Sequence, residues 1–142
     1  MSTQPPISDM HILPLQAAPD GVVLLREGDH VLRRFGQLSL HSLAAGSQGA
    51  YSLRAEADRV LFVIDGVVYA RLLDLRPQSP SHGVHTSISL SANAQAVLVP
   101  FGVACSIAAA DAARVLWLST HSAPHAGDRD ATPDELAQFA AN

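Results

Sequence analysis

The sequence predicts an all-β fold, a sandwich or barrel of short strands, with one short helix at its C-terminal end. From residue 21 onward, apolar runs alternate with turn residues, which is the spacing of such folds. Hydrophobic residues make up 48% of the chain and charged residues 15%, as expected of a well-packed core. We expect strands in the apolar runs at 21–25, 36–43, 59–64, 67–75, 85–90, 94–100, 105–109 and 113–119.

A chain of 142 residues suits one domain. Its beginning contains Pro5, Pro6, Pro14 and Pro19, each of which lacks a backbone donor and has a fixed φ. We therefore expect residues 1–20 to form an irregular lead-in or an edge segment. Residues 21–142 are expected to form the single domain.

The only helical pattern lies at the C-terminal end. Thr132, Pro133 and Glu135 have the spacing of a capping box, with Thr132 as the N-cap and Pro133 at the first helical position. This spacing predicts a helix over about 133–141. Leu136, Phe139 and Ala140 would share one face of this helix and pack on the strands.

The dipeptide Asp65-Gly66 separates two apolar runs and predicts a tight β-hairpin. In that hairpin Ile64 would pair with Val67, Phe62 with Tyr69 and Val60 with Arg71, all on one face. The opposite face is wholly aliphatic and is expected to be core: Leu61, Val63, Val68, Ala70 and Leu72. The face that carries Tyr69 and Arg71 could line a ligand pocket or lie in solvent.

Charge and cysteine content exclude some classes of function. The formal net charge is −4, and the nine basic residues are all arginines without a cluster beyond Arg33-Arg34, so a nucleic-acid partner is not expected. The single cysteine cannot form an internal disulfide. The N-terminal residues lack the charged and apolar regions of a signal peptide, and no apolar run approaches the length of a membrane span. We expect a soluble cytoplasmic protein that does not interact with membranes.

Three segments carry a resemblance to known proteins. Residues 74–83 (DLRPQSPSHG) with 88–104 (ISLSANAQAVLVPFGVA), and residues 115–129 (VLWLSTHSAPHAGDR), resemble the dTDP-4-dehydrorhamnose 3,5-epimerases. The closing TPDELAQF is more similar to the dTDP-4-keto-6-deoxyhexose 3,4-ketoisomerases. The resemblance implies a cupin-type β-barrel, or jelly roll, of the sugar-nucleotide cupin superfamily. It also implies a dTDP-sugar as ligand, isomerase chemistry in carbohydrate biosynthesis, and a homodimer.

The resemblance places Tyr51 and Cys105 where these families have histidines. The segment 48–53 matches the glycine-containing strand that carries the family's catalytic histidine, and Tyr51 takes the histidine position. Histidines titrate near pH 6.5 and tyrosines near pH 10, so a tyrosine there would donate a hydrogen bond rather than accept a substrate proton. Cys105 is either a small buried residue or a ligand-binding thiol. Ala123-Pro124 aligns His121 with a family tyrosine, so His121 is a catalytic candidate or a surface histidine at a strand end.

Other side chains are candidates for ligand binding. Arg54, Arg59 and Arg71 could contact a diphosphate, because guanidinium groups bind phosphates in two-point contacts. His41 shares an alternating face with Gln37 and Ser39, and this polar stripe lies beside the pocket or in solvent. Tyr69, on the same strand face as Arg71, is a further ligand-binding candidate. At the positions of the metal ligands of other cupins the chain has Tyr51, Leu53, Glu56 and Cys105. We therefore expect neither a metal nor another cofactor.

Three functions are compatible with these features. The first is a dTDP-4-keto-sugar epimerase or ketoisomerase with a degenerate active site, in which His121, Tyr51 and Arg71 carry the chemistry. The second is a non-catalytic cupin that binds a nucleotide sugar or another small ligand. The third is an interaction module whose barrel is filled by side chains such as Phe62, Tyr69 and Trp117.

Overall fold

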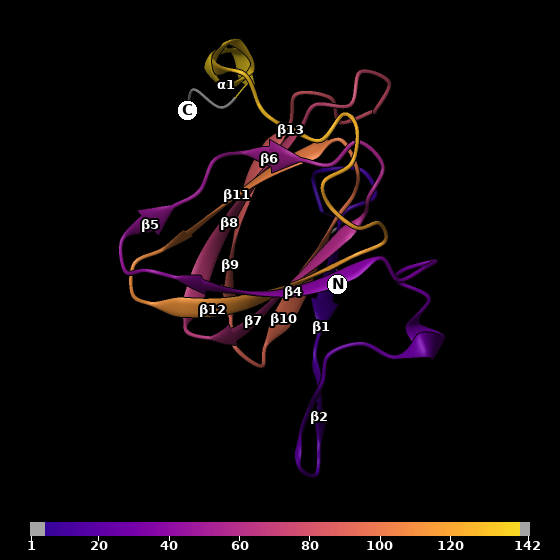
Figure 1. The fold of residues 1–142 in the computed structure, drawn as a ribbon, viewed down its shortest axis with the longest axis vertical. Coiled ribbons are helices and arrows are strands. Elements are labelled where there is room, and N and C mark those ends of the chain that lie inside the picture. The colour runs from indigo at the N-terminus through magenta and orange to yellow at the C-terminus, as the bar shows by residue number, and fades with distance from the viewer. Residues whose placement is uncertain (1–4, 140–142) are drawn as a thin grey trace.

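The computed structural model describes residues 5–139 and shows two antiparallel sheets that face each other (Figure 1). The first sheet contains, in order, β1 (His11–Pro14), β10 (Gln95–Val99), β7 (Arg59–Asp65), β12 (Ala113–Ser119) and β4 (Gln37–Leu43). The second contains β13 (Arg129–Asp130), β6 (Ser52–Leu53), β11 (Val103–Ala109), β8 (Val67–Asp74) and β9 (His85–Ser91), with β5 (Ser47–Gln48) also paired to β11. All the expected strands are present, and the all-β prediction is confirmed.

The main core lies between the two sheets. Leu61 and Val63 of β7 face Val68, Ala70 and Leu72 of β8, and each of these side chains is at most 1% exposed. The aliphatic face predicted from the alternation is therefore the core. The outer face of the first sheet is also covered, because Val60 and Phe62 are buried against residues 13–32.

The predicted hairpin at Asp65-Gly66 is wrong. β7 pairs with β10 and β12, whereas β8 pairs with β9 and β11, so the two strands belong to different sheets. Gly66 has a φ of +87°, as a tight reversal requires, but the reversal is a corner from one sheet to the other. Strands β9 and β10 are likewise in different sheets. The residues Asp65 and Gly66 specify that the chain reverses here. The partners of β7 and β8 are determined by pairing with strands farther along the sequence.

The N-terminal segment is more regular than expected. β1 is an edge strand of the first sheet, which agrees with one of the two expectations for residues 1–20. Before it, Ile7 and Met10 are buried in the main core. After it, β2 (Gln16–Ala18) and β3 (Gly21–Val23) form a separate ribbon that projects from the body (Figure 1), followed by a 3-10 turn at Glu27–Asp29.

The C-terminal helix α1 (Pro133–Phe139) begins as predicted, while residues 140 and 141 of the expected range, and with them Ala140, lie outside the described residues. The capping box is present: Glu135 N–H donates to Thr132 Oγ1 at 3.1 Å, and Thr132 N–H donates to Glu135 Oε1 at 2.8 Å. Leu136 and Phe139 pack on Leu53, Leu73, Leu75 and Ala104, on the outer side of the second sheet. Within residues 5–139, no helix has the length and apolarity to span a bilayer.

A buried carboxylate connects the loop after β8 to the N-terminal segment. Asp74 is fully buried and accepts hydrogen bonds from Arg76 Nε at 2.9 Å, Ser79 Oγ at 2.6 Å and Ser81 Oγ at 2.6 Å. Arg76 in turn donates to Ser8 O at 2.7 Å and Asp9 Oδ2 at 3.2 Å. Burial alone would raise the pKa of Asp74, but the hydrogen bonds from Arg76, Ser79 and Ser81 outweigh it and lower the pKa to about 2.

We predict that Asp74→Asn destabilises the fold in a pH-dependent way. Because the folded-state pKa is below the ordinary value of 3.8, the charge stabilises the protein above about pH 4, and this contribution is lost as the pH falls through about 2. At pH 7, Asp74→Asn should therefore lower the free energy of unfolding by about 2 kcal/mol relative to wild type. Urea unfolding of both proteins between pH 7 and pH 2 measures it. The exposed Asp20→Asn is the control, and a stability difference between wild type and Asp74→Asn that does not change with pH would contradict the assignment.

Candidate functional site

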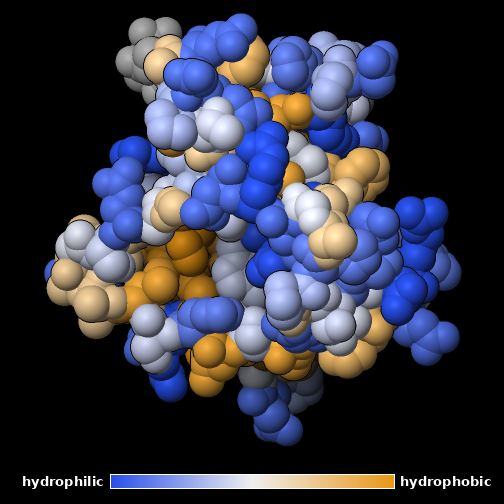
Figure 2. Space-filling view, turned by 45° about the horizontal axis from the view of Figure 1, so that its top comes forward, coloured by the Kyte–Doolittle hydropathy of each residue, from blue (hydrophilic) through white to orange (hydrophobic). Residues whose placement is uncertain are grey.

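A cavity of about 290 Å³ opens between the two sheets. One wall comes from β4, β7 and β12 of the first sheet, and the other from β11 and the segment 49–54. Figure 2 shows the molecule hollowed here, with apolar side chains in the depth of the hollow. The residues that line this interior cavity are Gln37, Ser39, His41, Gly49, Ala50, Ser52, Arg54, Arg59, Cys105, Ile107, Trp117 and Ser119.

Arg59 is the buried cation of the interior cavity. The residue is 4% exposed, its Nη2 donates to Ser52 O at 3.0 Å, and its guanidinium carbon lies 4.8 Å from the centre of the Trp117 ring. Its Nε is buried and has no hydrogen-bond partner among the described residues. Burial lowers the pKa of Arg59, although an arginine remains a cation at neutral pH. No carboxylate within residues 5–139 accepts a hydrogen bond from this guanidinium, so it has an unused donor and an unneutralised charge.

Cys105 lies on the opposite wall, where it pairs with Ser52 across the sheet. The residue is 3% exposed, and burial raises the pKa of its thiol to about 11, against the opposing effect of Arg59. The thiol is therefore protonated at neutral pH and is a poor nucleophile. Cys105 does line the cavity, but as a neutral group.

The polar stripe predicted on β4 faces the interior cavity. Gln37, Ser39 and His41 all belong to its lining. Ser39 Oγ lies 2.8 Å from His41 Nε2. His41 therefore lines the cavity and is at the same time exposed to solvent.

Arg54 lies at the margin of the cavity and is neutralised by a carboxylate. Its Nη1 is 3.1 Å from Asp128 Oδ2. Burial would raise the pKa of Asp128, but hydrogen bonds from the backbone of Ala55 and His125 and from Arg54 lower it. The ion pair joins the segment after β6 to the loop before β13, and it leaves Arg59 as the cation without a carboxylate in the cavity lining.

Tyr51 lies outside the cavity, in contrast to the prediction. Its hydroxyl is 3.1 Å from His85 Nε2, and its ring packs with Leu53 and Leu73 on the outer side of the second sheet. Side chains alternate along an extended chain, so the inward residue is Ser52. Burial, and then Arg71, lower the pKa of the neighbouring His85.

Tyr69 and Arg71 also face outward. Tyr69 is 50% exposed and Arg71 is exposed, while Val68, Ala70 and Leu72 between and beside them are buried. Of the two alternatives for this face, the structure selects solvent. Neither residue reaches the interior cavity, because its strand presents the opposite face to the core.

His121 does not join Trp117 and Ser119 in the cavity lining. Strand β12 ends at Ser119, and the chain turns before His121, whose Nδ1 lies 2.9 Å from Thr120 Oγ1. The His121 ring packs edge-on against His125 at a centroid distance of 6.1 Å. This corresponds to the surface alternative, a histidine at a strand end.

Sequence reasoning missed Ser52 as an inward residue, although a signal for it was present. Ser52 and Arg54 share one face of an extended segment, and Tyr51 and Leu53 share the other. Since Arg54 was a ligand-binding candidate, alternation alone would have placed Ser52 beside it. Within residues 5–139, no group of three or more His, Cys, Asp or Glu side chains is arranged to hold a metal ion.

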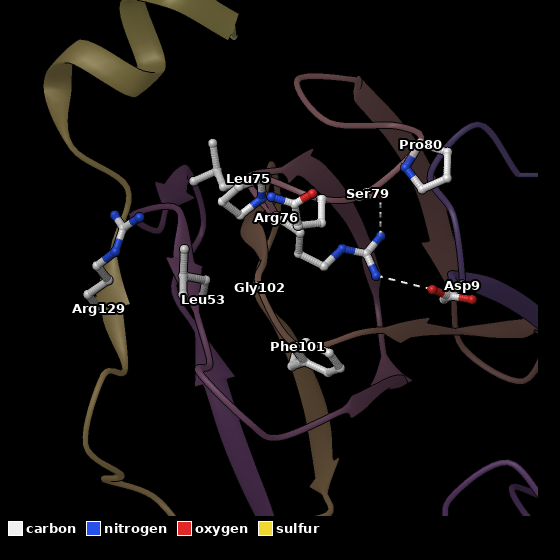
Figure 3. Close-up of a pocket in the computed structure, with 11 residues that line it drawn as sticks. Asp9, Leu53, Leu75, Arg76, Ser79, Pro80, Phe101, Gly102 and Arg129 are labelled. Atoms are coloured by element: carbon white, nitrogen blue, oxygen red, sulfur yellow. Dashed lines mark hydrogen bonds and ion pairs between the residues drawn. The ribbon is translucent and has the colours of Figure 1, made fainter.

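A larger cavity of about 560 Å³ lies outside the sandwich, between the loop after β8, the turn at Phe101-Gly102 and β13 (Figure 3). Its floor contains Leu53, Leu75 and Phe101. Its two arginines are already neutralised, Arg76 by Asp74 and Arg129 by Glu135 at 2.7 Å. This outer cavity is larger, but both of its arginines are paired with carboxylates. The interior cavity contains the unpaired guanidinium of Arg59, and it therefore has the chemistry of a binding site for a charged or carbonyl ligand.

Comparison with protein families adds a match that covers more than half of the chain. A sequence model described as dTDP-4-dehydrorhamnose 3,5-epimerase matches residues 50–134. Among curated proteins, none matches this sequence.

Solved structures share the fold over nearly the whole chain. A dTDP sugar isomerase from Desulfovibrio desulfuricans G20 is 20% identical with a TM-score of 0.82, over 94% of this chain and 90% of that one. A dTDP-4-dehydrorhamnose 3,5-epimerase from Bacillus anthracis, with TDP and pyrophosphate bound, is 21% identical with a TM-score of 0.76, over 89% and 81%. An enzyme from Legionella pneumophila in complex with dTDP-4-keto-L-rhamnose is 17% identical with a TM-score of 0.77, over 92% and 78%. At these identities the comparison establishes the jelly-roll cupin fold.

We predict that the Cys105 thiol does not react in the native protein. Its burial and its pKa of about 11 leave little thiolate at pH 7. Labelling with a chromogenic disulfide should be slow in the folded state and complete within minutes in about 6 M guanidinium chloride, a concentration that unfolds most domains. Rapid labelling of the native protein would show that the wall around Cys105 opens.

Proposed function

Because the chain belongs to the dTDP-4-dehydrorhamnose 3,5-epimerase family, we propose that its interior cavity binds a nucleotide sugar of the dTDP-4-keto-sugar class. The sugar would enter between β4 and the segment 49–54, and its carbonyl or enolate oxygen would contact Arg59. In this proposal the protein is an epimerase or ketoisomerase in carbohydrate biosynthesis, with an active site changed at both family histidine positions. Its location in the cytoplasm stays a prediction.

The observation that carries this proposal is the unpartnered Nε of the buried Arg59. Leaving a buried donor without a partner costs about 1 to 3 kcal/mol, and more for a charged group. A ligand oxygen within reach of Nε would supply the missing acceptor and offset this cost. An oxygen that develops negative charge is the acceptor that a guanidinium stabilises best.

The nucleotide's diphosphate would lie nearer the margin of the cavity, towards Arg54. Releasing Arg54 from Asp128 would make a second guanidinium available there, whereas Arg71 points away on the outer face. Tyr51 and His121 have no role in this proposal, because neither lines the cavity.

A non-catalytic cupin that binds the same class of ligand is the second candidate. It is favoured by the neutral thiol of Cys105 and by Ser52, which present no base on the wall formed by the second sheet. The third hypothesis, a barrel filled by side chains, loses support, since the interior is hollow and Phe62 and Tyr69 lie outside it.

Incubation with a dTDP-4-keto-6-deoxyhexose in deuterium oxide separates the first two functions. Entry of solvent deuterium into the sugar ring, measured by mass spectrometry, at a rate proportional to the protein concentration establishes the enzyme. Binding in calorimetry without exchange establishes the non-catalytic cupin. Absence of both contradicts the proposed ligand class.

We predict that Arg59→Met weakens binding of this sugar nucleotide by about 10-fold to 100-fold, the value of a hydrogen bond to a charged group. The same change should leave the melting temperature unchanged or raise it, because an apolar side chain often replaces a buried charge without loss of stability. Calorimetry and thermal unfolding measure the two effects. Arg71→Met, on the outer face, is the matched control. Unchanged binding in Arg59→Met would remove this arginine from the site.

We also propose that the protein is a homodimer formed through β4. This strand is an edge of the first sheet and pairs only with β12 among the described strands. Leu38 and Leu40 on it are 54% and 59% exposed, and Phe35 just before it is 67% exposed. The strand has no lysine or proline of the kind that protects free edges. Antiparallel pairing of β4 with its copy would use one patch twice and close the assembly as a two-fold dimer.

The dimer proposal predicts that Leu40→Lys converts the protein to a monomer, because it places a charge at the centre of the paired strands. Light scattering coupled to size-exclusion chromatography measures the mass. Val67→Lys is the control, since Val67 is similarly exposed on the other sheet, at 47%. A monomeric wild-type protein at micromolar concentration would refute the dimer.

A further inference from the structure

The interior cavity has one imidazole, and it comes from an unexpected wall. Tyr51 and His121, which the resemblance assigned to proton transfer, lie on the outer side of the second sheet and beyond the end of β12. His41 instead lies on β4, in the opposite sheet, and lines the cavity together with Ser39. Among the residues that the structure describes, no carboxylate belongs to the lining.

We propose that His41 is the catalytic residue that moves the substrate proton, and that Ser39 is a positioning residue that sets its tautomer. This inference rests on the proposed function, since it assigns the base for a ketone substrate held in the same cavity. It gives the reaction a proton-transfer group that the resemblance did not supply.

The other polar groups of the lining cannot serve as this base. Arginines stay protonated, which excludes Arg54 and Arg59. The pKa of Cys105 is about 11, because it is buried. The hydroxyls of Ser39, Ser52 and Ser119 and the amide of Gln37 do not accept a proton near neutral pH. Imidazole is the side chain that changes charge in the physiological range.

The contact between Ser39 and His41 joins one ring nitrogen, Nε2, to a hydroxyl that can donate or accept, and the proposal uses the tautomer in which Nε2 donates. In a neutral imidazole one nitrogen donates and the other accepts. With Nε2–H donating to Ser39 Oγ over the observed 2.8 Å, Nδ1 holds the free lone pair. When Nδ1 takes up a proton, the ring becomes a cation and its Nε2–H bond to Ser39 strengthens.

The proton-transfer step balances with water as the only other reactant. The bond between hydrogen and the carbon next to the ketone breaks, and the proton goes to His41 Nδ1. The electron pair stays with the substrate as an enolate, whose oxygen accepts a hydrogen bond from Arg59 Nε. Return of the proton from His41 to the same face of the planar enolate restores the starting sugar, and the epimer forms when a water molecule protonates the opposite face and the hydroxide left behind takes the proton from His41. His41 is exposed, so its proton exchanges with water between the two steps.

The experiment compares His41→Asn with wild type, using a dTDP-4-keto-6-deoxyhexose in deuterium oxide. We expect His41→Asn to bind the sugar nucleotide with unchanged affinity in calorimetry and to lose exchange by about 100-fold or more, as removal of a general base does. His121→Asn is the matched control and should exchange as wild type does. In His41→Ala, added imidazole should restore part of the lost rate, which a merely structural role would not allow.

Ser39→Ala should lower kcat and leave KM unchanged, and Ser39→Thr should recover the rate, because threonine keeps the hydroxyl. Wild-type exchange rates in both His41 variants would overturn the assignment of His41 and leave the proposed function intact. A wild-type protein that binds without exchange overturns the catalytic step but not the binding site. A wild-type protein that does not bind the sugar nucleotide overturns both proposals.

Discussion

The buried carboxylate of Asp74 is the constraint on which the arrangement of the loops depends. It binds Arg76, and the Arg76 side chain lies against the turn at Gly102, where a Cβ would collide with Arg76 Cγ. Gly102 N–H then donates to Arg54 O at 2.8 Å, which fixes the segment that carries Ser52 and Arg54 into the cavity wall. The Asp74–Arg76 pair is thus linked through Gly102 to a wall of the interior cavity, although neither group of the pair lines it.

The sequence predicted the strands, the core face and the C-terminal cap, because each depends on residues close together in the chain. Alternation placed Leu61, Val63 and Val68 in the core, and the spacing of Thr132 and Glu135 placed the helix start. It could not predict which strands pair. That choice depends on the pairing of β7 with β10 and β12 and on the burial of both its faces, and no local pattern around Asp65-Gly66 contains this information.

The candidate site was predicted in part for the same reason. Alternation along a single strand placed Gln37, Ser39 and His41 on one polar face, and all three line the cavity. Tyr51 was misplaced because side chains along an extended segment point to alternate sides, and Tyr51 lies on the side away from the cavity. His121 was misplaced because β12 ends two residues before it, where the chain turns. Positions inferred from a distant family are therefore least secure where a strand is short or ends.

The sheet corner at Gly66 delays the pairing of strands while the chain folds. Because β7 and β8 are not partners, the middle of the sequence contains no hairpin between them that could form early. Both β4 and β7 pair with β12, so a ribosome must synthesise the chain through Ser119 before either strand meets that neighbour. Folds dominated by such distant pairings fold on the scale of milliseconds to seconds, after loop closure has been achieved. Until then the apolar strands in the first half of the nascent chain remain available to chaperones or to one another.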